Sequence, residues 1–212
     1  TRTTEAIRKL DRRSTELELD VADANAVVRA VESCEQTLGP VDILVNNAGI
    51  VNNIAPIAEM EPEAWEHEMR VNLAGAFHCV RATVPKMAER GWGRVVNIAS
   101  VAARAPGLGQ PAYTASKAGV VAFTQSVAQE FGRGGVTANA IMPGLIATPL
   151  VLSMPEKIRD SIARQTPVGR VGEPAEIGSL VAYLCSPAAG FISATAIACD
   201  GGFLGAPVFA MS

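Results

Sequence analysis

The sequence has few of the residues that would build a metal site, a disulfide framework or a membrane span. Among 212 residues there are four cysteines and two histidines. No two cysteines have CxxC spacing and the histidines do not cluster with them, so neither a metal site nor a disulfide framework is expected. Free thiols of this kind fit a reducing, cytoplasmic location. No apolar run approaches the ~18 residues of a membrane helix, and no signal peptide is visible.

Charge is also scarce. Charged residues make up 18% of the chain and the net charge is −3. A nucleic-acid partner held mainly by charge is therefore excluded. Hydrophobic residues make up 49%, and a chain of this length should bury roughly 70% of its unfolded surface. We expect one globular domain spanning residues 1–212, with no linker or internal repeat.

Segments with strand and helix patterns alternate along the chain. This order predicts an α/β fold with a doubly wound, Rossmann-like parallel sheet. The expected strands are 16–21, 41–45, 94–99, 136–142 and 196–199. The expected helices are 4–13, 23–38, 62–90 with a break near Val71-Asn72, 113–131, 150–165 and 174–185.

Tyr113 and Lys117 are four residues apart, so they share one face of the predicted helix. An ammonium held over a phenol lowers the pKa of the phenol, and a tyrosine tuned in this way can exchange a proton with an alcohol or carbonyl oxygen. Ser100 ends the preceding strand and could hold that oxygen. Taken alone, the Tyr–Lys spacing is more often an ordinary exposed helix start. The serine and the further motifs below favour the chemical interpretation.

Three motifs fall where predicted strands end. Asn46, Ser100 and Pro143-Gly144 each follow a strand. In open parallel sheets, ligands bind beyond the carboxyl ends of the strands. We therefore expect these residues to line one rim.

Together, the motifs resemble those of classical short-chain dehydrogenases/reductases, in the branch similar to 3-oxoacyl-carrier-protein reductases. The matching stretches occur in family order from Asp20 to Gly202, which is nearly the whole chain. They are Asp20-Val21, Asn46-Asn47-Ala48-Gly49, Asn72, Ser100, Tyr113-x-x-x-Lys117, Pro143-Gly144 with Thr148, and Asp200-Gly201-Gly202.

The resemblance implies a role for each residue. Tyr113 would be the general acid/base, Ser100 would bond the substrate oxygen, and Lys117 would lower the tyrosine pKa and bond the nicotinamide ribose. Asn72 would hold a water that links Lys117 to solvent. The residues implied for NAD or NADP binding are Asp20, Val21, Asn46, Ala48, Gly49, Tyr113, Lys117, Pro143, Gly144, Ile146 and Thr148.

Simpler structural interpretations stay open for several of these residues. Asn46-Asn47 fits a turn, because Asn tolerates left-handed backbone. Asn72 fits a helix break, and Asp20 fits a solvated carboxylate at a strand end. Asp200-Gly201-Gly202 is better explained as structural than as catalytic.

One family element is absent. The family opens with a strand, a glycine-rich turn that cradles the pyrophosphate, a helix and a second strand. No such glycine pattern occurs here, and Thr1 aligns with the helix after the second strand. Either those residues exist and are left out of this sequence, or the chain is truncated. We favour the first, because truncation would expose apolar surface. The residue that separates NAD from NADP is not visible in either case.

The predicted function is transfer of a hydride between NAD(P)(H) and a secondary alcohol or ketone. A non-catalytic sensor or scaffold on the same fold is the alternative, since fold does not determine function. Residues 145–172 should form a flap over the substrate. The apolar side chains of this flap fit a hydrophobic alcohol, a cyclic alcohol or an acyl thioester. The resemblance also implies a homotetramer.

Overall fold

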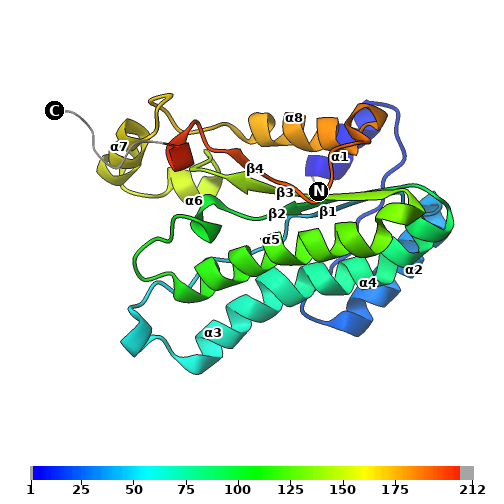
Figure 1. Ribbon diagram of the computed structural model, residues 1–212, viewed down its shortest axis with the longest axis horizontal. Coiled ribbons are helices and arrows are strands. Elements are labelled where there is room, and N and C mark those ends of the chain that lie inside the picture. Colours follow the sequence, from blue (N-terminus) through cyan, green and yellow to red (C-terminus); the bar gives the residue numbers. More distant parts are fainter. Residues whose placement is uncertain (1, 206–212) are drawn as a thin grey trace.

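A computed structural model describes residues 2–205 and contains a four-stranded, fully parallel sheet (Figure 1). The strand order is β1-β2-β3-β4, so each strand pairs with its neighbours in sequence. The expected α/β fold with a parallel sheet is confirmed. The strands are β1 (Ile43–Asn46), β2 (Gly93–Ile98), β3 (Val136–Pro143) and β4 (Ala196–Cys199).

Helices cover both faces of this sheet (Figure 1). The helices α3, α4 and α5 pack below it in this view, and α8 packs above it. The helices α6 and α7 project beyond the left end of the strands. The α-helices are α1 (Arg2–Lys9), α2 (Ala24–Leu38), α3 (Pro62–Met69), α4 (Gly75–Glu89), α5 (Pro111–Phe131), α6 (Pro149–Leu152), α7 (Glu156–Gln165) and α8 (Pro174–Cys185). The short helical turns are η1 (Ile57–Glu59), η2 (Arg70–Ala74), η3 (Val101–Ala103), η4 (Gly132–Gly134), η5 (Pro187–Ala189) and η6 (Phe203–Gly205).

Alternation of side chains along β2 builds two cores. Val95 packs with Val84 and Val127 on the α4/α5 face. Val96 packs with Leu184 on the α8 face. Successive strand residues point to opposite faces, so an uninterrupted apolar run can supply both cores.

The expected break near Val71-Asn72 is confirmed as a π-helical turn. The turn η2 separates α3 from α4, and the Gly75 amide donates to Arg70 O across it. Asn72 lies in this turn and is buried. Single π turns inside helices occur frequently at functional sites.

Three expectations about the elements are wrong. Residues 16–21 form no strand, because no strand of residues 2–205 pairs with them. The strand near 41–45 is not covered on both faces: Ile43 and Val45 are 44% and 40% exposed, because the α8 core reaches Val96 but not β1. The helix expected over 150–165 is two helices, separated by the break that ends at Pro155.

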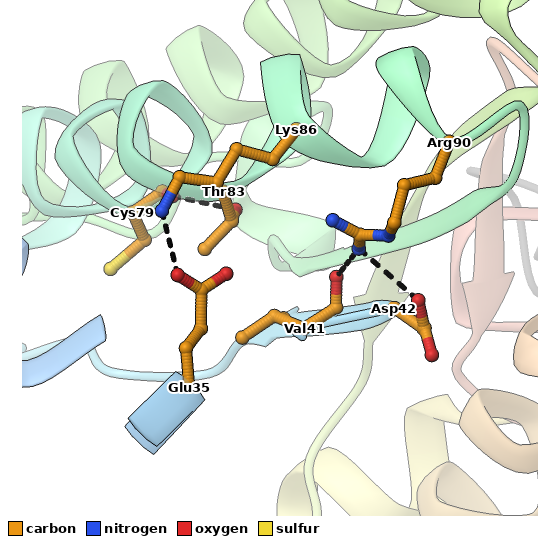
Figure 2. A network of polar contacts seen from close by, with 7 residues as sticks. All are labelled: Glu35, Val41, Asp42, Cys79, Thr83, Lys86 and Arg90. Atoms are coloured by element: carbon orange, nitrogen blue, oxygen red, sulfur yellow. Dashed lines mark hydrogen bonds and ion pairs between the residues drawn. The ribbon is translucent and has the colours of Figure 1, made fainter. Parts of the chain in front are cut away.

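Helix α4 is anchored to α2 and to the chain entering β1 by two cations (Figure 2). Lys86 Nζ lies 2.6 Å from Glu35 Oε2, and Arg90 donates to Val41 O and to Asp42 Oδ1, the latter at 3.1 Å. Asp23 caps α2, and Gly39 ends it at a φ of 102°. Among residues 2–205 no helix has the length and apolar character needed to cross a membrane.

Candidate active site

Ser100 and Tyr113 meet at the carboxyl edge of the sheet. Ser100 follows β2 by two residues, and its hydroxyl accepts from the Ala102 amide at 3.1 Å, which caps η3. Tyr113 lies in the first turn of α5, which begins at Pro111, a residue suited to a first helical position. The Ser100 hydroxyl lies near enough to the phenol to lower the pKa of Tyr113. The structure therefore brings these two predicted side chains together.

Lys117 lies one turn further along α5 and is only 4% exposed. Its Nζ donates to Ile98 O, at the end of β2, at 2.8 Å, and lies 5.8 Å from the centre of the Tyr113 ring. Burial lowers the pKa of Lys117 to about 8, because a charge removed from water loses solvation. An ammonium has three donors, and this hydrogen bond uses one.

The expected lowering of the Tyr113 pKa is wrong for the protein as described. Burial, the largest effect, raises the pKa of Tyr113 above its ordinary value. The nearby Ser100 hydroxyl lowers the Tyr113 pKa, and the negative charge of Glu68 raises it. The phenol is buried beside an ammonium that is itself desolvated, so loss of solvation outweighs stabilisation of the phenolate.

Asn72 binds its neighbours with its whole side chain. Its Oδ1 accepts from the Ile50 amide at 2.7 Å, and its Nδ2 donates to Ile50 O at 2.9 Å and to Ser116 Oγ at 3.1 Å. Ser116 in turn donates to Tyr113 O at 2.8 Å. The predicted water relay through Asn72 stays a prediction. Its side-chain amide ties the loop after β1 to α5.

A second buried polar chain was not expected from the sequence. Asn46 Nδ2 donates to Asn97 Oδ1 at 2.8 Å, and Asn97 Nδ2 donates to Thr124 Oγ1 at 2.8 Å. Asn46 and Asn97 are register partners in β1 and β2. Asn97 is fully buried and stands between Val96 and Ile98 in β2, and an amide between apolar strand residues is the signal that could have identified it.

Ala48 and Gly49 follow β1 at the same edge. A Cβ added at Gly49 would lie 3.1 Å from Lys117 Nζ and 3.3 Å from Asn72 Oδ1. Glycine therefore lets this loop lie against the ammonium without crowding it. Ala48 and Gly49 are exposed, so the loop that contacts Lys117 has an outer face on which a cofactor could lie. These residues fit the nicotinamide cofactor that the sequence implies.

Asp20 and Val21 lie in the segment before α2. Asp20 Oδ1 accepts from the Ala22 amide at 2.9 Å and stays exposed. The Val21 carbonyl accepts from His78 Nδ1 at 3.0 Å. Val21 also packs so closely on Gly75 that a Cβ added at Gly75 would lie 2.7 Å from Val21 Cγ2. Val21 is therefore positioned against the start of α4, with Asp20 beside it facing solvent.

Pro143 and Gly144 lead from β3 into the segment 145–172. The Gly144 amide donates to Cys199 O at 3.1 Å, and an added Cβ would lie 2.9 Å from Asp200 Cα, so glycine is required by close approach. Ile146 forms an isolated parallel bridge with Gly172. The bridge closes the base of the segment, so α6 and α7 form an excursion from one point. Thr148 caps α6 by accepting from the Val151 amide at 3.4 Å.

A small cavity lies at the base of this excursion, where Leu145, Ile146 and Gly172 are among its lining residues. Its volume is about 120 Å³, which is too small for a drug-sized ligand, since such sites measure about 300–1,000 Å³. None of Asn72, Ser100, Tyr113 or Lys117 lines it. We do not assign it to the substrate.

Glu68 is the residue near this site that sequence reasoning missed. It is fully buried in α3, whereas Glu63 and Glu66 on the same helix are exposed. Its position one turn before Asn72 was the available signal, because residues i and i+4 share a helix face.

Comparison with known proteins agrees with this geometry. The family described as enoyl-(acyl carrier protein) reductase matches residues 1–204. Nodulation protein G of Azospirillum brasilense is 44% identical over 183 residues, which is 86% of this chain and 74% of that protein. Acetoacetyl-CoA reductase of Rhizobium meliloti (strain 1021) is 44% identical over 184 residues, 86% of this chain and 76% of the reductase.

Solved structures give the same result. A protein from Sinorhizobium meliloti 1021, described as a short-chain alcohol dehydrogenase, superposes with a TM-score of 0.92 at 32% identity. The match covers 97% of this chain and 82% of that one. The buried Tyr113–Lys117 pair, the parallel sheet and these relatives together show that the chain belongs to the short-chain dehydrogenase/reductase family.

Proposed function

We propose that the protein is an NAD(P)-dependent oxidoreductase that interconverts a secondary alcohol and a ketone. The observation that carries the proposal is the Tyr113 phenol, which lies close to the Ser100 hydroxyl and beside the buried Lys117 ammonium at the carboxyl edge of the sheet. A phenol and a hydroxyl that converge at one point can hold a single substrate oxygen between them.

In this proposal Tyr113 gives its proton to the carbonyl oxygen during reduction, and Ser100 donates a hydrogen bond to the same oxygen. Because the pKa of Tyr113 is raised, the phenol carries its proton at neutral pH. This state favours proton donation, and therefore reduction of a ketone. The Lys117 ammonium stabilises the phenolate left behind, since its Nζ lies 5.8 Å from the ring centre.

The cofactor would lie along the strand ends. Asp20 and Val21 would contact its adenine half, and Asn46, Ala48 and Gly49 would line its ribose side. Pro143, Gly144, Ile146 and Thr148 would line the nicotinamide, and Lys117 would bond the adjacent ribose. When bound, the nicotinamide donates or accepts the hydride. The support is the exposed loop at Ala48 and Gly49, which lies against Lys117.

Lys117 would also return a proton to Tyr113 after each turnover. Its pKa of about 8 allows the ammonium to lose and regain a proton near neutral pH. Asn72 supports the position of Tyr113 through Ser116, which donates to the backbone carbonyl of Tyr113 in the same turn of α5. We retain the water relay at Asn72 as part of the proposal.

The substrate would enter beneath residues 145–172, which we propose as a flap within a single domain. Its side chains Leu150, Leu152 and Ile158 are 61%, 54% and 47% exposed, so its surface suits an apolar substrate. The similarity to an acetoacetyl-CoA reductase makes a 3-oxoacyl thioester the first substrate to test. We further propose a homotetramer.

The test is turnover of acetoacetyl-CoA, simple ketones and cyclic ketones by the full protein, with NADH and with NADPH. Tyr113→Phe should reduce kcat by about a thousandfold, because general acid catalysis contributes this order. Tyr183→Phe is the matched control, since the chain has two tyrosines and Tyr183 lies on α8. Near-normal turnover by Tyr113→Phe would refute the proposed role. Failure of the protein to bind either nucleotide would favour a scaffold function.

A further inference from the structure

Glu68 is a buried carboxylate that the proposed reaction does not use. It is 0% exposed in the last full turn of α3. Acidic side chains are almost never fully buried unless they are paired. No ion pair to Glu68 is found within residues 2–205. Packing alone does not account for a charged residue at this position.

One oxygen of Glu68 holds the loop that follows β1. Its Oε1 accepts from the Asn52 amide at 2.9 Å and from the Asn53 amide at 3.2 Å. Its Oε2 is buried and has no hydrogen-bond partner in the described part of the chain. The carboxylate therefore fixes two consecutive backbone amides through Oε1, and its Oε2 can still accept a hydrogen bond.

The same loop is bonded to the segment that enters α5. The Ala55 amide donates to Gly109 O at 2.9 Å. An added Cβ at Gly109 would lie 3.0 Å from Ile54 Cγ2, so the two segments touch closely. Gly109 directly precedes Gln110, the N-cap of the helix that carries Tyr113. A shift of the loop is thus transmitted to the start of α5.

Helix α3 and the adjoining π turn hold this loop at two points. Asn72, four residues after Glu68, bonds both the amide and the carbonyl of Ile50. Asn72 also bonds Ser116 on α5. The hydrogen bonds form a closed circuit from Glu68 through the loop to Gly109 and α5, and back through Asn72.

The charge of Glu68 also reaches the phenol. It raises the pKa of Tyr113, next to the larger effect of burial. Helix α3 packs against α5 and η2. The ionisable groups near it on these elements are Tyr113 and Lys117 on α5 and Arg70 on η2, and residues 50–56 carry none. Removing this one negative charge should therefore be visible in the titration of the phenol.

We propose that Glu68 is a positioning residue, which fixes the Asn52–Asn53 backbone as a wall of the site and thereby sets the start of α5 that presents Tyr113. The inference rests on the proposed role of Tyr113. In this role Glu68 acts through the backbone amides that it holds and touches no reacting atom.

The first experiment measures structure and needs no substrate. Hydrogen exchange at the Asn52 and Asn53 amides is compared in the wild type, Glu68→Gln, Glu68→Ala and the control Glu66→Gln. Glu66 lies two residues away on the same helix and is exposed. The alanine variant should lose protection at both amides, whereas the isosteric glutamine, which keeps an acceptor, should retain it. Unchanged protection in a folded Glu68→Ala would overturn the proposal.

The second experiment measures turnover of the same four proteins against pH. Glu68→Ala should raise KM and reduce kcat/KM by about a hundredfold, the cost of a misplaced group. Glu68→Gln should keep its KM, and its high-pH limb should move to lower pH, because a charge that raises the Tyr113 pKa is gone. A pH profile unmoved in Glu68→Gln, with normal KM in Glu68→Ala, would contradict the inference. Active Tyr113→Phe would instead overturn the proposed function and leave the exchange result standing.

Discussion

Two neighbouring groups of buried polar residues lie at the carboxyl edge of the sheet, and they differ in how completely they are hydrogen-bonded. In the bonded group, each side chain has protein partners for its polar atoms. In the open group, acceptor or donor capacity remains, or the pKa is displaced. The bonded group is Asn72, Asn97, Ser116 and Thr124. The open group is Glu68, Tyr113 and Lys117.

The difference separates residues that support the fold from residues on which turnover should depend. A buried amide with all partners satisfied rigidifies its surroundings and does not titrate. A buried ammonium or phenol with few partners is costly, and its pKa is displaced by lost solvation. Displaced pKa values concentrate at functional sites. Substitutions in the bonded group should therefore change stability, and substitutions in the open group should change activity.

Asn97→Ala should show the largest loss of stability. The change leaves Asn46 Nδ2 without its acceptor and removes the donor to Thr124. Unsatisfied buried groups cost about 1–3 kcal/mol each, so the free energy of unfolding should fall by about 3 kcal/mol. Urea unfolding measures it. An unchanged midpoint would show that the bonded group does not support the fold.

Lys117→Met should abolish turnover yet stabilise the protein. The fall of the Lys117 pKa from 10.5 to about 8 corresponds to a cost of about 3 kcal/mol at neutral pH. Loss of the hydrogen bond to Ile98 O offsets about 1 kcal/mol, which leaves a gain of about 2 kcal/mol at pH 7.

The pH dependence of the stability gained by Lys117→Met shows whether the gain comes from removal of the buried charge. Between pH 8 and 10.5 the unfolded chain binds more protons at Lys117 than the folded chain does. The wild type should therefore become more stable as pH rises through this window. The advantage of Lys117→Met should shrink over the same window. A constant advantage would assign it to packing instead of charge.

Ser116→Ala should have the smallest effect. Its hydroxyl accepts from Asn72 and donates to Tyr113 O. We expect a loss of about 1 kcal/mol in unfolding free energy. Turnover measured alongside should fall far less than in Tyr113→Phe. A comparable fall in turnover would move Ser116 into the open group and break the distinction.

Much of the fold was readable from the sequence because buried parallel strands and amphipathic helices have strong patterns. The strand at 196–199 and the helix at 174–185 match the structure residue for residue. The pattern at 16–21 failed because alternation cannot show whether a pairing partner exists. The exposure of Ile43 and Val45 depended on where α8 ends, which no local pattern encodes.

The sequence predicted which residues come together in the site, but it did not predict the direction in which the Tyr113 pKa is shifted. Spacing placed Ser100, Tyr113 and Lys117 together. The direction of the Tyr113 pKa could not be read, because it depends on the depth of burial. Glu68 was missed because one glutamate in an acidic helix looks solvated until the packing of α3 on α5 is known.

The most direct test of this account is the titration of Tyr113 itself. In a Tyr183→Phe background Tyr113 is the single remaining tyrosine, so one ¹³C-tyrosine NMR signal reports it. The account predicts a midpoint above the ordinary value of 10.0, moved to lower pH by Glu68→Gln. A midpoint at or below that value in the folded, unliganded protein would contradict the claim that this site holds its proton ready for donation.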